Sequence, residues 1–561
     1  MDKSIASNPV EGIKAASNYL RGTLVESLLD GATGSIAESD TQVSKFHGIY
    51  QQDDRDVRET RRRQKLEPDH SFMIRARVPG GICTPEQWLA LDAIATTWAN
   101  HSLRLTTRQA FQFHGVLKRD LKRSIRSIND SLLDTIAACG DVNRNVMCTA
   151  LPELSGLHAD VYRAAASVSE HLTPNTRAYH EIWLDQQKVT DTQDSEPIYG
   201  DVYLPRKFKI AFAIPPHNDV DVLAHDLGFI ATADAGKLTG FTITAGGGMG
   251  ATHGDPTTWP RLADALGWCR PDQVVAVSEA IVTIQRDFGN RGDRKHARFK
   301  YTLEKHGLDW IRQELEHRLG YTIAPPRPFV FTKNGDEFGW KRSDDGLWHL
   351  LLFTQNGRLE DNAFASQLTG MREIARIHRG DFRLTPNQNV VIANVAQQHK
   401  SIIDELAAKH GLDSYKHLSA LRLHSIACVA LPTCGQAMAE AERYLPDLVG
   451  RIEQQLETHR LLDQPITIRM TGCPNGCARP YLAEIGLVGK APGRYNLHLG
   501  ATFEGTRLNR MILENANEAE ILAALDQQFA GYGAHRNAGE YFGDYFVRTQ
   551  QETDRGERRH G

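Results

Sequence analysis

The feature that most constrains the fold of this chain of 561 residues is an internal repeat. The segment LRLTTRQ at 103–109 recurs as FRLTPNQ at 382–388, with four of seven positions identical at an offset of 279. NRNVMCTA at 143–150 aligns with LHSIACVA at 423–430 at an offset of 280. A strand-like segment, a glycine turn and a helix-like segment precede each copy, and Thr84 followed by Glu86 and Gln87 predicts the helix start in the first copy. The near-constant offset predicts an α+β fold of two pseudo-symmetric halves that face each other across a pocket.

The two copies differ in their chemistry at matched positions. The first copy carries basic residues where the second carries neutral ones, and the second has gained a cysteine. This division is expected if one half binds an anion and the other holds a metal centre. The aligned pairs are Arg75 with Leu352, Arg108 with Asn387, Cys148 with Cys428, and Leu154 with Cys434.

Composition and charge exclude several classes of protein. The chain is 41% hydrophobic and 24% charged, which is typical of globular proteins, and its formal net charge of −4 gives no basic field for nucleic acid. The length suggests about three or four domains at ~150 residues each. The N-terminus lacks a signal-like apolar core, and no stretch approaches the ~20 apolar residues of a membrane span. The sequence therefore predicts a soluble cytoplasmic protein.

Four of the eight cysteines are clustered near the C-terminal end. They read C-x5-C and then C-x3-C, and the second pair follows the strand-like segment PITIRM. Four thiolates are the usual ligands of a [4Fe–4S] cluster, and they also make structural zinc sites, for which the first spacing is long. Gly472, Pro474 and Gly476 permit a turn whose N–H groups point at sulfur. The clustered residues are Cys428, Cys434, Cys473 and Cys477.

These cysteines, with TGCPNGC around the second pair, resemble the sulfite/nitrite reductase family. The likeness extends from about residue 17 to about residue 548 and includes SNYLRGT, KFHGIYQQDDRD, YLPRKFK and GLVGKAPGRYNLHLG. It implies a sirohaem beside a [4Fe–4S] cluster held by all four cysteines, with Cys477 also bound to the sirohaem iron. It also implies the six-electron reduction of sulfite to sulfide. Nitrite reduction, or a zinc or iron–sulfur protein without haem, stays open.

A sulfite site needs several cations to hold the oxyanion and groups that deliver protons. Lys207 and Lys209 are two residues apart, so on a strand they share one face. Taken alone, each basic residue would more often be a solvated charge. By motif match, the predicted sulfite-binding cations are Arg75, Arg144, Lys207 and Lys209. The predicted macrocycle contacts are Arg104, Arg108, Gln112, His114, Arg206, Arg298 and Lys300, with the glycine run 246–248 allowing close approach of the backbone.

The chain contains no dinucleotide fingerprint, phosphate-binding loop or flavin-binding segment. A separate electron donor is therefore expected, and the resemblance implies a flavoprotein with FAD and FMN, with ferredoxin as the alternative. The C-terminal tail departs from the apolar, proline-containing tail of the family. The predicted division is residues 1–66 as a solvated arm and docking segment, 67–138 with 340–415 as the ferredoxin-like halves, 139–339 as the basic domain, and 416–561 as the cysteine domain.

Overall fold

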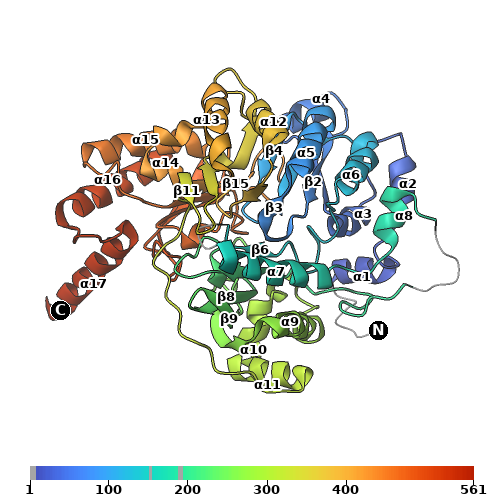
Figure 1. Ribbon diagram of the computed structural model, residues 1–561, viewed down its shortest axis with the longest axis horizontal. Helices are drawn as coiled ribbons and strands as arrows, with labels where there is room; N and C mark the ends of the chain where they lie inside the picture. Colours follow the sequence, from blue (N-terminus) through green and yellow to red (C-terminus); the bar gives the residue numbers. More distant parts are fainter. Residues whose placement is uncertain (1–7, 151–154, 188–193, 561) are drawn as a thin grey trace.

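The computed structural model describes residues 8–150, 155–187 and 194–560. Its strands form four sheets of five strands each, and helices pack on them. Figure 1 shows the C-terminal helices α15, α16 and α17 at one end of the molecule, away from α5 and α6. The α+β class predicted from the sequence is confirmed. We call the sheets 1 to 4 and define each by its strands below.

Sheets 1 and 3 are antiparallel and have matching layouts. Sheet 1 has the order β1-β2-β5-β4-β13, and sheet 3 has the order β11-β12-β15-β14-β3. The strands of sheet 1 are β1 Ile49–Asp53, β2 His70–Ala76, β5 Phe111–Val116, β4 Ser102–Leu105 and β13 Arg358–Glu360. Those of sheet 3 are β11 Gly339–Arg342, β12 Trp348–Leu352, β15 Val390–Val395, β14 Asp381–Leu384 and β3 Ile82–Cys83. Their helices are α5 Pro85–Trp98 and α6 Leu121–Asp130, and α12 Gln367–Ile377 and α13 Lys400–Lys409.

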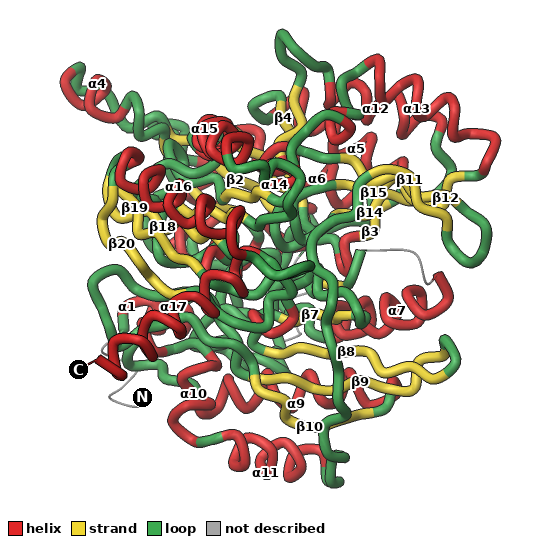
Figure 2. The backbone as a smooth tube through the Cα atoms, turned by 90° about the vertical axis from the view of Figure 1, so that its left-hand side faces the viewer, coloured by secondary structure: helices red, strands yellow, loops and turns green. Residues whose placement is uncertain are grey.

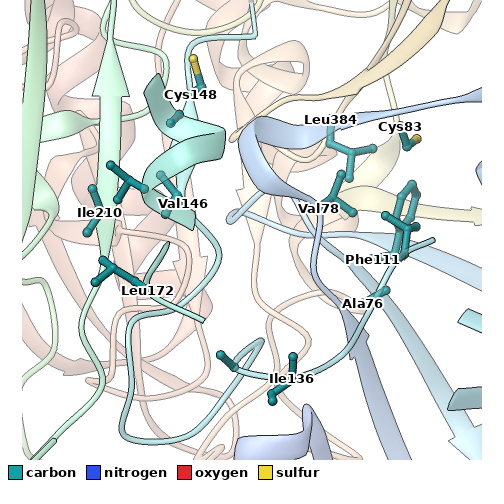
Figure 3. Packing of buried hydrophobic residues seen from close by; sticks show 14 of the residues in the cluster. Ala76, Val78, Cys83, Phe111, Ile136, Val146, Cys148, Leu172, Ile210 and Leu384 are labelled. Atoms are coloured by element: carbon teal, nitrogen blue, oxygen red, sulfur yellow. The ribbon is translucent and has the colours of Figure 1, made fainter. Parts of the chain in front are cut away.

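The two halves exchange their last strand. β3 comes from the first half but pairs with β14 of sheet 3, and β13 comes from the second half but pairs with β4 of sheet 1. Figure 3 shows the resulting junction, where Leu384 of β14 lies near Cys83 and Val78 of the first half. The contact between α5 and α12 adds to this junction. Neither half therefore completes its sheet without the other.

Sheets 2 and 4 show that the duplication extends over the rest of the chain. In both sheets, the first three strands in chain order are parallel to one another. Each of the last two strands pairs antiparallel with the strand before it. Sheet 2 contains β6 Met147–Cys148, β7 Ile210–Ala213, β8 Leu227–Asp234, β9 Lys237–Ala245 and β10 Asp264–Cys269. Sheet 4 contains β16 Ser425–Ala427, β17 Ile468–Thr471, β18 Ile485–Ala491, β19 Arg494–Leu499 and β20 Arg510–Ala516. Their larger helices are α7 Ser155–His171, α8 Ala178–Leu184, α9 Val274–Phe288, α10 Phe299–His306, α11 Leu308–Leu319, α15 Leu445–Thr458, α16 Glu518–His535 and α17 Phe542–His560.

Local sequence explains where the helices begin and which face they bury. Thr84 accepts a hydrogen bond from the backbone N–H of Gln87, and Gln87 returns one to Thr84, so a capping box starts α5. This confirms the helix start predicted from the sequence. In α6, Leu121, Ile125 and Ile128 recur at helical spacing and are buried, as an amphipathic helix requires.

Strand register corrects one pair of the sequence alignment. Arg75 pairs with Gln112 in sheet 1, and the equivalent pair in sheet 3 joins Leu351 to Val391. The counterpart of Arg75 is therefore Leu351, and the predicted Leu352 is wrong by one residue. The connection between β12 and β14 is longer than the one between β2 and β4. The sequence offset between the two halves therefore differs before and after this connection. Leu154, the predicted counterpart of Cys434, lies outside the described residues.

The expectation of a solvated N-terminal arm is wrong for most of its length. This region forms α1 Pro9–Ala16, α2 Leu24–Leu29, α3 Asp40–Val43, β1 and α4 Arg58–Arg63. Leu20, Leu24 and Phe46 are buried in the main apolar core, which also includes side chains from sheets 1, 2 and 3. Apolar residues interspersed among the polar ones supply that packing. Of this region's helices, α4 has no buried residue.

No helix in the described ranges combines the length and the apolar character needed to cross a bilayer.

Candidate functional site

A row of polar and basic side chains runs across sheet 1. Gln112 of β5 lies opposite Arg75 of β2 and Arg104 of β4, and Arg104 lies opposite Arg358 of β13. Residues directly opposite one another on neighbouring strands project from the same face of the sheet. His114 is two residues from Gln112 on β5 and shares that face. Four of the predicted site residues are thus brought together by strand pairing.

A turn at residues 138–140 orients two of the predicted sulfite-binding cations. The Arg75 guanidinium donates to the Cys139 thiol at 3.0 Å and to the Ala138 carbonyl at 3.4 Å. Arg144 donates from Nε to the Gly140 carbonyl at 2.8 Å and from Nη1 to the Ala138 carbonyl at 3.4 Å. Gly140 has a φ of +89°, which favours glycine. The turn therefore holds Arg75 and Arg144 from the same side.

The two predicted lysines flank a residue that bridges to the Arg144 loop. Phe208, between Lys207 and Lys209, pairs with Asn143, and its carbonyl accepts the Arg144 backbone N–H at 2.9 Å. The side chains of both lysines are half-buried, and within the described part of the chain neither has a hydrogen bond or ion pair. Two cations without a counter-charge stand beside the arginines.

The cationic environment lowers the pKa of both lysines. Burial, together with Arg206 and Arg298, lowers the pKa of Lys207 to about 7. Burial and the charges of Lys207 and Arg108 lower the pKa of Lys209 well below its usual value. Like charges in a partly buried site repel each other and favour the neutral amine. An anion bound among these groups would relieve the repulsion.

The four cysteines lie on two neighbouring loops, and Cys473 and Cys477 lie on a loop at a strand end, as predicted. Cys428 follows β16, and Cys473 and Cys477 follow the parallel strand β17. The Gly472 N–H donates to the Cys428 sulfur at 3.3 Å, and the side chain of Asn475 donates to the Cys473 sulfur at 3.6 Å. The sulfur-directed N–H group predicted from the glycines is therefore present. Among the described residues, no three His, Cys, Asp or Glu side chains lie close enough together to hold one metal ion as they stand.

The charges of the clustered thiols act on the pKa of three of the four cysteines. Burial raises the pKa of Cys428, and the charges of Cys477, Cys434 and Cys473 raise it further. Burial, and then Cys477, also raise the pKa of Cys434. Burial and Cys477 raise that of Cys473 to about 12. Thiolates that raise one another's pKa are stabilised when a cation or metal centre compensates their charge.

Cys477 connects the cysteines to the cations. It is the exposed member of the four. Burial lowers the pKa of Arg75. The charges of Cys139, Tyr50 and Cys477 raise it by more, so the pKa of Arg75 lies above its usual value. The Cys477 charge also acts on Lys207 and Lys209. One thiol therefore faces three of the four predicted cations.

Loops from both halves converge at Cys477. The Thr107 hydroxyl donates to the Cys477 carbonyl at 3.0 Å. Arg479 donates to the carbonyl of Thr107 and to that of Pro386, each at 3.1 Å. The Ala251 N–H, just after the glycine run, donates to the Pro474 carbonyl at 2.9 Å. The glycine run, predicted to approach a flat ring, thus lies against the cysteine loop.

Several predicted macrocycle contacts have unsatisfied polar atoms. Both ring nitrogens of buried His114 and the Nε of Arg108 lack a hydrogen-bond partner in the described chain. Burial, with Arg144 and Arg75, lowers the pKa of Arg108 to about 9. Burial, with Asp141 opposing it, lowers that of Arg206 to about 10. Buried polar groups without partners are uncommon and point to a ligand.

Other predicted contacts already have partners within the protein. Arg104 pairs with Glu442 at 2.9 Å, and Arg298 pairs with buried Asp226 at 2.8 Å. Lys300 donates to the carbonyls of Gly248 at 3.1 Å, Gly250 at 2.8 Å and Trp259, so it braces the glycine run. Their role toward a macrocycle stays a prediction, and the structure gives each of them a positioning role.

The interpretation of the sequence missed three residues that organise the site. Glu442 pairs with Arg104 and Arg358, and its backbone N–H donates to the Cys428 carbonyl at 3.1 Å. Arg479 joins the loops of both halves, and Arg55 donates to the Cys434 carbonyl at 3.2 Å. Arg479 lies two residues after the quoted motif TGCPNGC and Arg55 lies in KFHGIYQQDDRD, so proximity to a motif was the available signal. For Glu442 no such signal exists.

The residues present fit an anionic, iron-containing cofactor beside an iron–sulfur cluster. The unpaired lysines can bind the carboxylates of such a cofactor, and the unpartnered nitrogens of His114 can contact its ring. The N–H groups directed at sulfur suit thiolate ligands. In the second half, the turn at 385–389 corresponds to the turn at 106–110 of the first half, and its polar side chains bind a carboxylate of the protein itself. Asn387, Thr385 and Asn389 all donate to buried Asp336 at 2.7–3.0 Å.

Family comparisons agree with this geometry. Residues 164–323 match the family described as "Nitrite and sulphite reductase 4Fe-4S domain". Residues 63–130 and 341–409 match "Nitrite/Sulfite reductase ferredoxin-like half domain". The first range contains Lys207 and Lys209, and the other two contain the repeat. The four cysteines lie outside the matched ranges.

Individual relatives match nearly the whole chain. A Myxococcus xanthus protein named "Sulfite reductase [NADPH] hemoprotein beta-component" is 59% identical over 96% of both chains. A protein of the same name from Anoxybacillus flavithermus is 58% identical over 96% of this chain and 95% of its own. The solved structure of the Mycobacterium tuberculosis NirA protein has a TM-score of 0.78 over 97% of this chain and 96% of its own, and at 24% identity it supports the fold. The repeat, the cation site and these matches establish that the chain belongs to the nitrite and sulfite reductase family.

Proposed function

We propose that the chain is the haemoprotein component of an NADPH-dependent sulfite reductase, which reduces sulfite to sulfide by six electrons. The observation that carries the proposal is a group of four cations, of which Arg75, Lys207 and Lys209 are within electrostatic reach of the Cys477 thiol and the two lysines have no side-chain partner among the described residues. The names of the relatives support the same function. Sulfite carries more negative charge than nitrite, and a cluster of four cations suits it better.

Each part of the site has a chemical task under this proposal. Cys428, Cys434, Cys473 and Cys477 would hold a [4Fe–4S] cluster, and Cys477 would also bind a sirohaem iron. Arg108, Arg206 and His114 would contact the macrocycle. When bound, the two cofactors would supply the electrons that break the S–O bonds of sulfite.

The four cations bind the oxyanion and control its protons. Arg75 and Arg144 are oriented by the turn at 138–140, and each guanidinium offers a rigid fork of donors to an oxyanion. Lys207, whose pKa is about 7, can hold or release a proton at Nζ in the working range. Oxygen leaves sulfite as water only after protonation, so this arrangement supplies both charge and protons.

An absorption spectrum of the purified holoprotein tests the cofactor assignment. A strong Soret band with a red-shifted visible band is expected, and the bands should shift when sulfite and a reductant are added. A colourless zinc protein would overturn the assignment. An iron–sulfur spectrum without a Soret band would reduce the function to electron transfer.

Substitution of Lys209 tests the choice between sulfite and nitrite. Lys209→Asn removes one unpaired cation and is expected to lower kcat/KM for sulfite by about tenfold or more, consistent with ~1.5–3 kcal/mol for a charged hydrogen bond. Nitrite turnover should fall much less. Lys237→Met, on an exposed position of β9, is the control. Equal losses for both substrates would contradict the assigned preference.

The electron donor is proposed to be a flavoprotein that docks on the N-terminal region. Deleting residues 1–60 would remove the proposed docking region, but it would also remove β1 and core residues such as Phe46. A loss of activity in that variant could therefore come from disturbed folding. Figure 2 shows α4 at the periphery of the molecule, and its residues Arg62 and Arg63 are largely exposed. Reversing these two charges should slow turnover driven by NADPH and the flavoprotein but spare turnover driven by methyl viologen. Loss of both activities would count against docking there.

A further inference from the structure

We propose that Arg55 is a positioning residue that holds the loop of Cys434 and stabilises the iron–sulfur cluster. The proposal rests on the cluster assigned above and adds a residue outside the cysteine motifs. Arg55 lies in the N-terminal region, 379 positions away from Cys434 in sequence. It follows β1 and precedes α4, so it belongs to the link between them.

The Arg55 side chain contacts the cysteine loop at two backbone oxygens. Its Nη1 donates to the Cys434 carbonyl at 3.2 Å and to the Ala437 carbonyl at 2.7 Å. The Ala437 N–H also donates to the Cys434 carbonyl at 3.0 Å. The guanidinium therefore closes the turn that begins at Cys434. A charged donor shared by two carbonyls holds such a turn more firmly than a neutral one.

Two further contacts secure the same loop around Arg55. The Arg55 backbone N–H donates to the Pro432 carbonyl at 3.4 Å, before Cys434. Beyond the turn, Arg443 pairs with Asp56 at 2.6 Å. Residues 55 and 56 thus contact the loop on both sides of the thiol. Because the Asp56–Arg443 pair is half-exposed, most of the constraint is assigned to Arg55.

The same segment is anchored to the strand that carries Arg75. β1 pairs with β2 along its whole length, and Ile49 lies opposite Ile74, the neighbour of Arg75. Pairing at one end and hydrogen bonds at the other make residues 49–56 a short brace between sheet 1 and the Cys434 loop. The cluster loop and the cation row are therefore positioned relative to each other by one stretch of chain.

The charge of Arg55 has an expected effect on the cluster. A reduced cluster is more negative than an oxidised one, so a nearby fixed cation favours the reduced form. The closed turn also limits access of water and oxygen to the Cys434 ligand. Removing the guanidinium should lower the cluster's midpoint potential and speed its loss in air, even where the fold is unchanged.

The test compares Arg55→Ala, Arg55→Lys and Arg58→Ala as anaerobically purified holoproteins. Arg58→Ala is the matched control, because Arg58 lies nearby and its ion pair, among the described residues, is with Asp53, away from the cysteines. The readouts are iron and acid-labile sulfide content, the rate of cluster bleaching in air, and the midpoint potential followed by electron paramagnetic resonance. Bleaching about tenfold faster, and a lower potential, are expected for Arg55→Ala, because the variant loses a charged donor shared by two carbonyls. Arg55→Lys, which keeps a charged donor, should recover most of the difference.

The outcomes separate this inference from the proposed function. If the wild-type protein holds no iron–sulfur cluster, the assigned function fails first. If it holds one and Arg55→Ala bleaches at the wild-type rate with an unchanged potential, the positioning role is overturned. Equal changes in Arg55→Ala and Arg58→Ala would also overturn it, since they would indicate general loosening of the link. Should Arg55→Ala be insoluble, Arg55→Gln, which keeps one neutral donor, replaces it with the same expected direction.

Discussion

At the scale of single residues, the site is built from charges that the polypeptide itself does not neutralise. Lys207 and Lys209 have no side-chain partner in the described chain, whereas Arg298 is paired with buried Asp226 and Arg104 with partly buried Glu442. Unpaired cations close together cost stability, and paired ones cost much less. The unpaired lysines therefore lower the stability of the folded protein at the place where an anion binds. Such a trade-off between stability and activity is common at functional sites.

Lys207 gives this relation a measurable pH dependence. Its pKa is about 7 in the folded protein, against ~10.4 for an unfolded lysine. Between those values the unfolded chain binds more protons, so the stability of the cofactor-free protein rises with pH. The cost of the charge is largest below about pH 7 and vanishes above ~10.4.

Lys207→Met should therefore stabilise the cofactor-free protein below about pH 7 and give no gain above ~10.4. Because the side chain is half-buried, we expect a gain of only about 1–2 kcal/mol. Urea unfolding across this pH range measures it, and Lys237→Met, on the exposed part of β9, should show no such trend. A gain that grew with pH would contradict the assignment.

At the scale of secondary-structure elements, the strand exchange is the main device that joins the halves. β13 and β3 are short, and each completes the sheet of the other half. A short edge strand contributes little by itself, but here its side chains lie in the shared core. The halves are therefore expected to unfold together.

Leu359→Ala tests this coupling at β13. Leu359 is fully buried and pairs with Leu103 of β4. Loss of its side chain should cost about 2–4 kcal/mol. Hydrogen exchange should become faster in sheet 1 and sheet 3 by similar factors. Leu132→Ala, at a position that is 90% exposed, serves as the control. Faster exchange confined to sheet 1 would show that the halves are independent.

At the scale of the whole molecule, the apolar packing is divided unequally. Sheet 4, with α15, α16 and α17, has an apolar core of its own, while sheets 1, 2 and 3 contribute to one larger core. Polar links such as Arg479 with Asp221 at 2.6 Å join the two. The cysteines therefore stand on a separately packed unit beside the cation pocket.

This division predicts two unfolding transitions for the cofactor-free protein. Phe542 is buried in the core of sheet 4, where it packs on Phe529 with ring centroids 5.3 Å apart. Phe542→Ala should cost about 3–4 kcal/mol and lower only the transition of sheet 4. Differential scanning calorimetry distinguishes it from Leu359→Ala, which should lower the other transition. A single transition lowered by both variants would show that the polar links make one cooperative unit.

The sequence by itself determined the duplicated α+β plan, the start of α5, the two cysteine loops and the residue types of the cation site. These features depend on periodicity, turn residues and motif spacing, which are local. It did not determine the strand exchange, the register at Arg75, the packed N-terminal region, or the partners of Arg104, Arg298 and Lys300. Only the tertiary structure decided these, because pairing between residues hundreds of positions apart depends on how whole sheets pack. Arg55 is the clearest case, since its partner loop lies 379 residues away and its motif gives no sign of that contact.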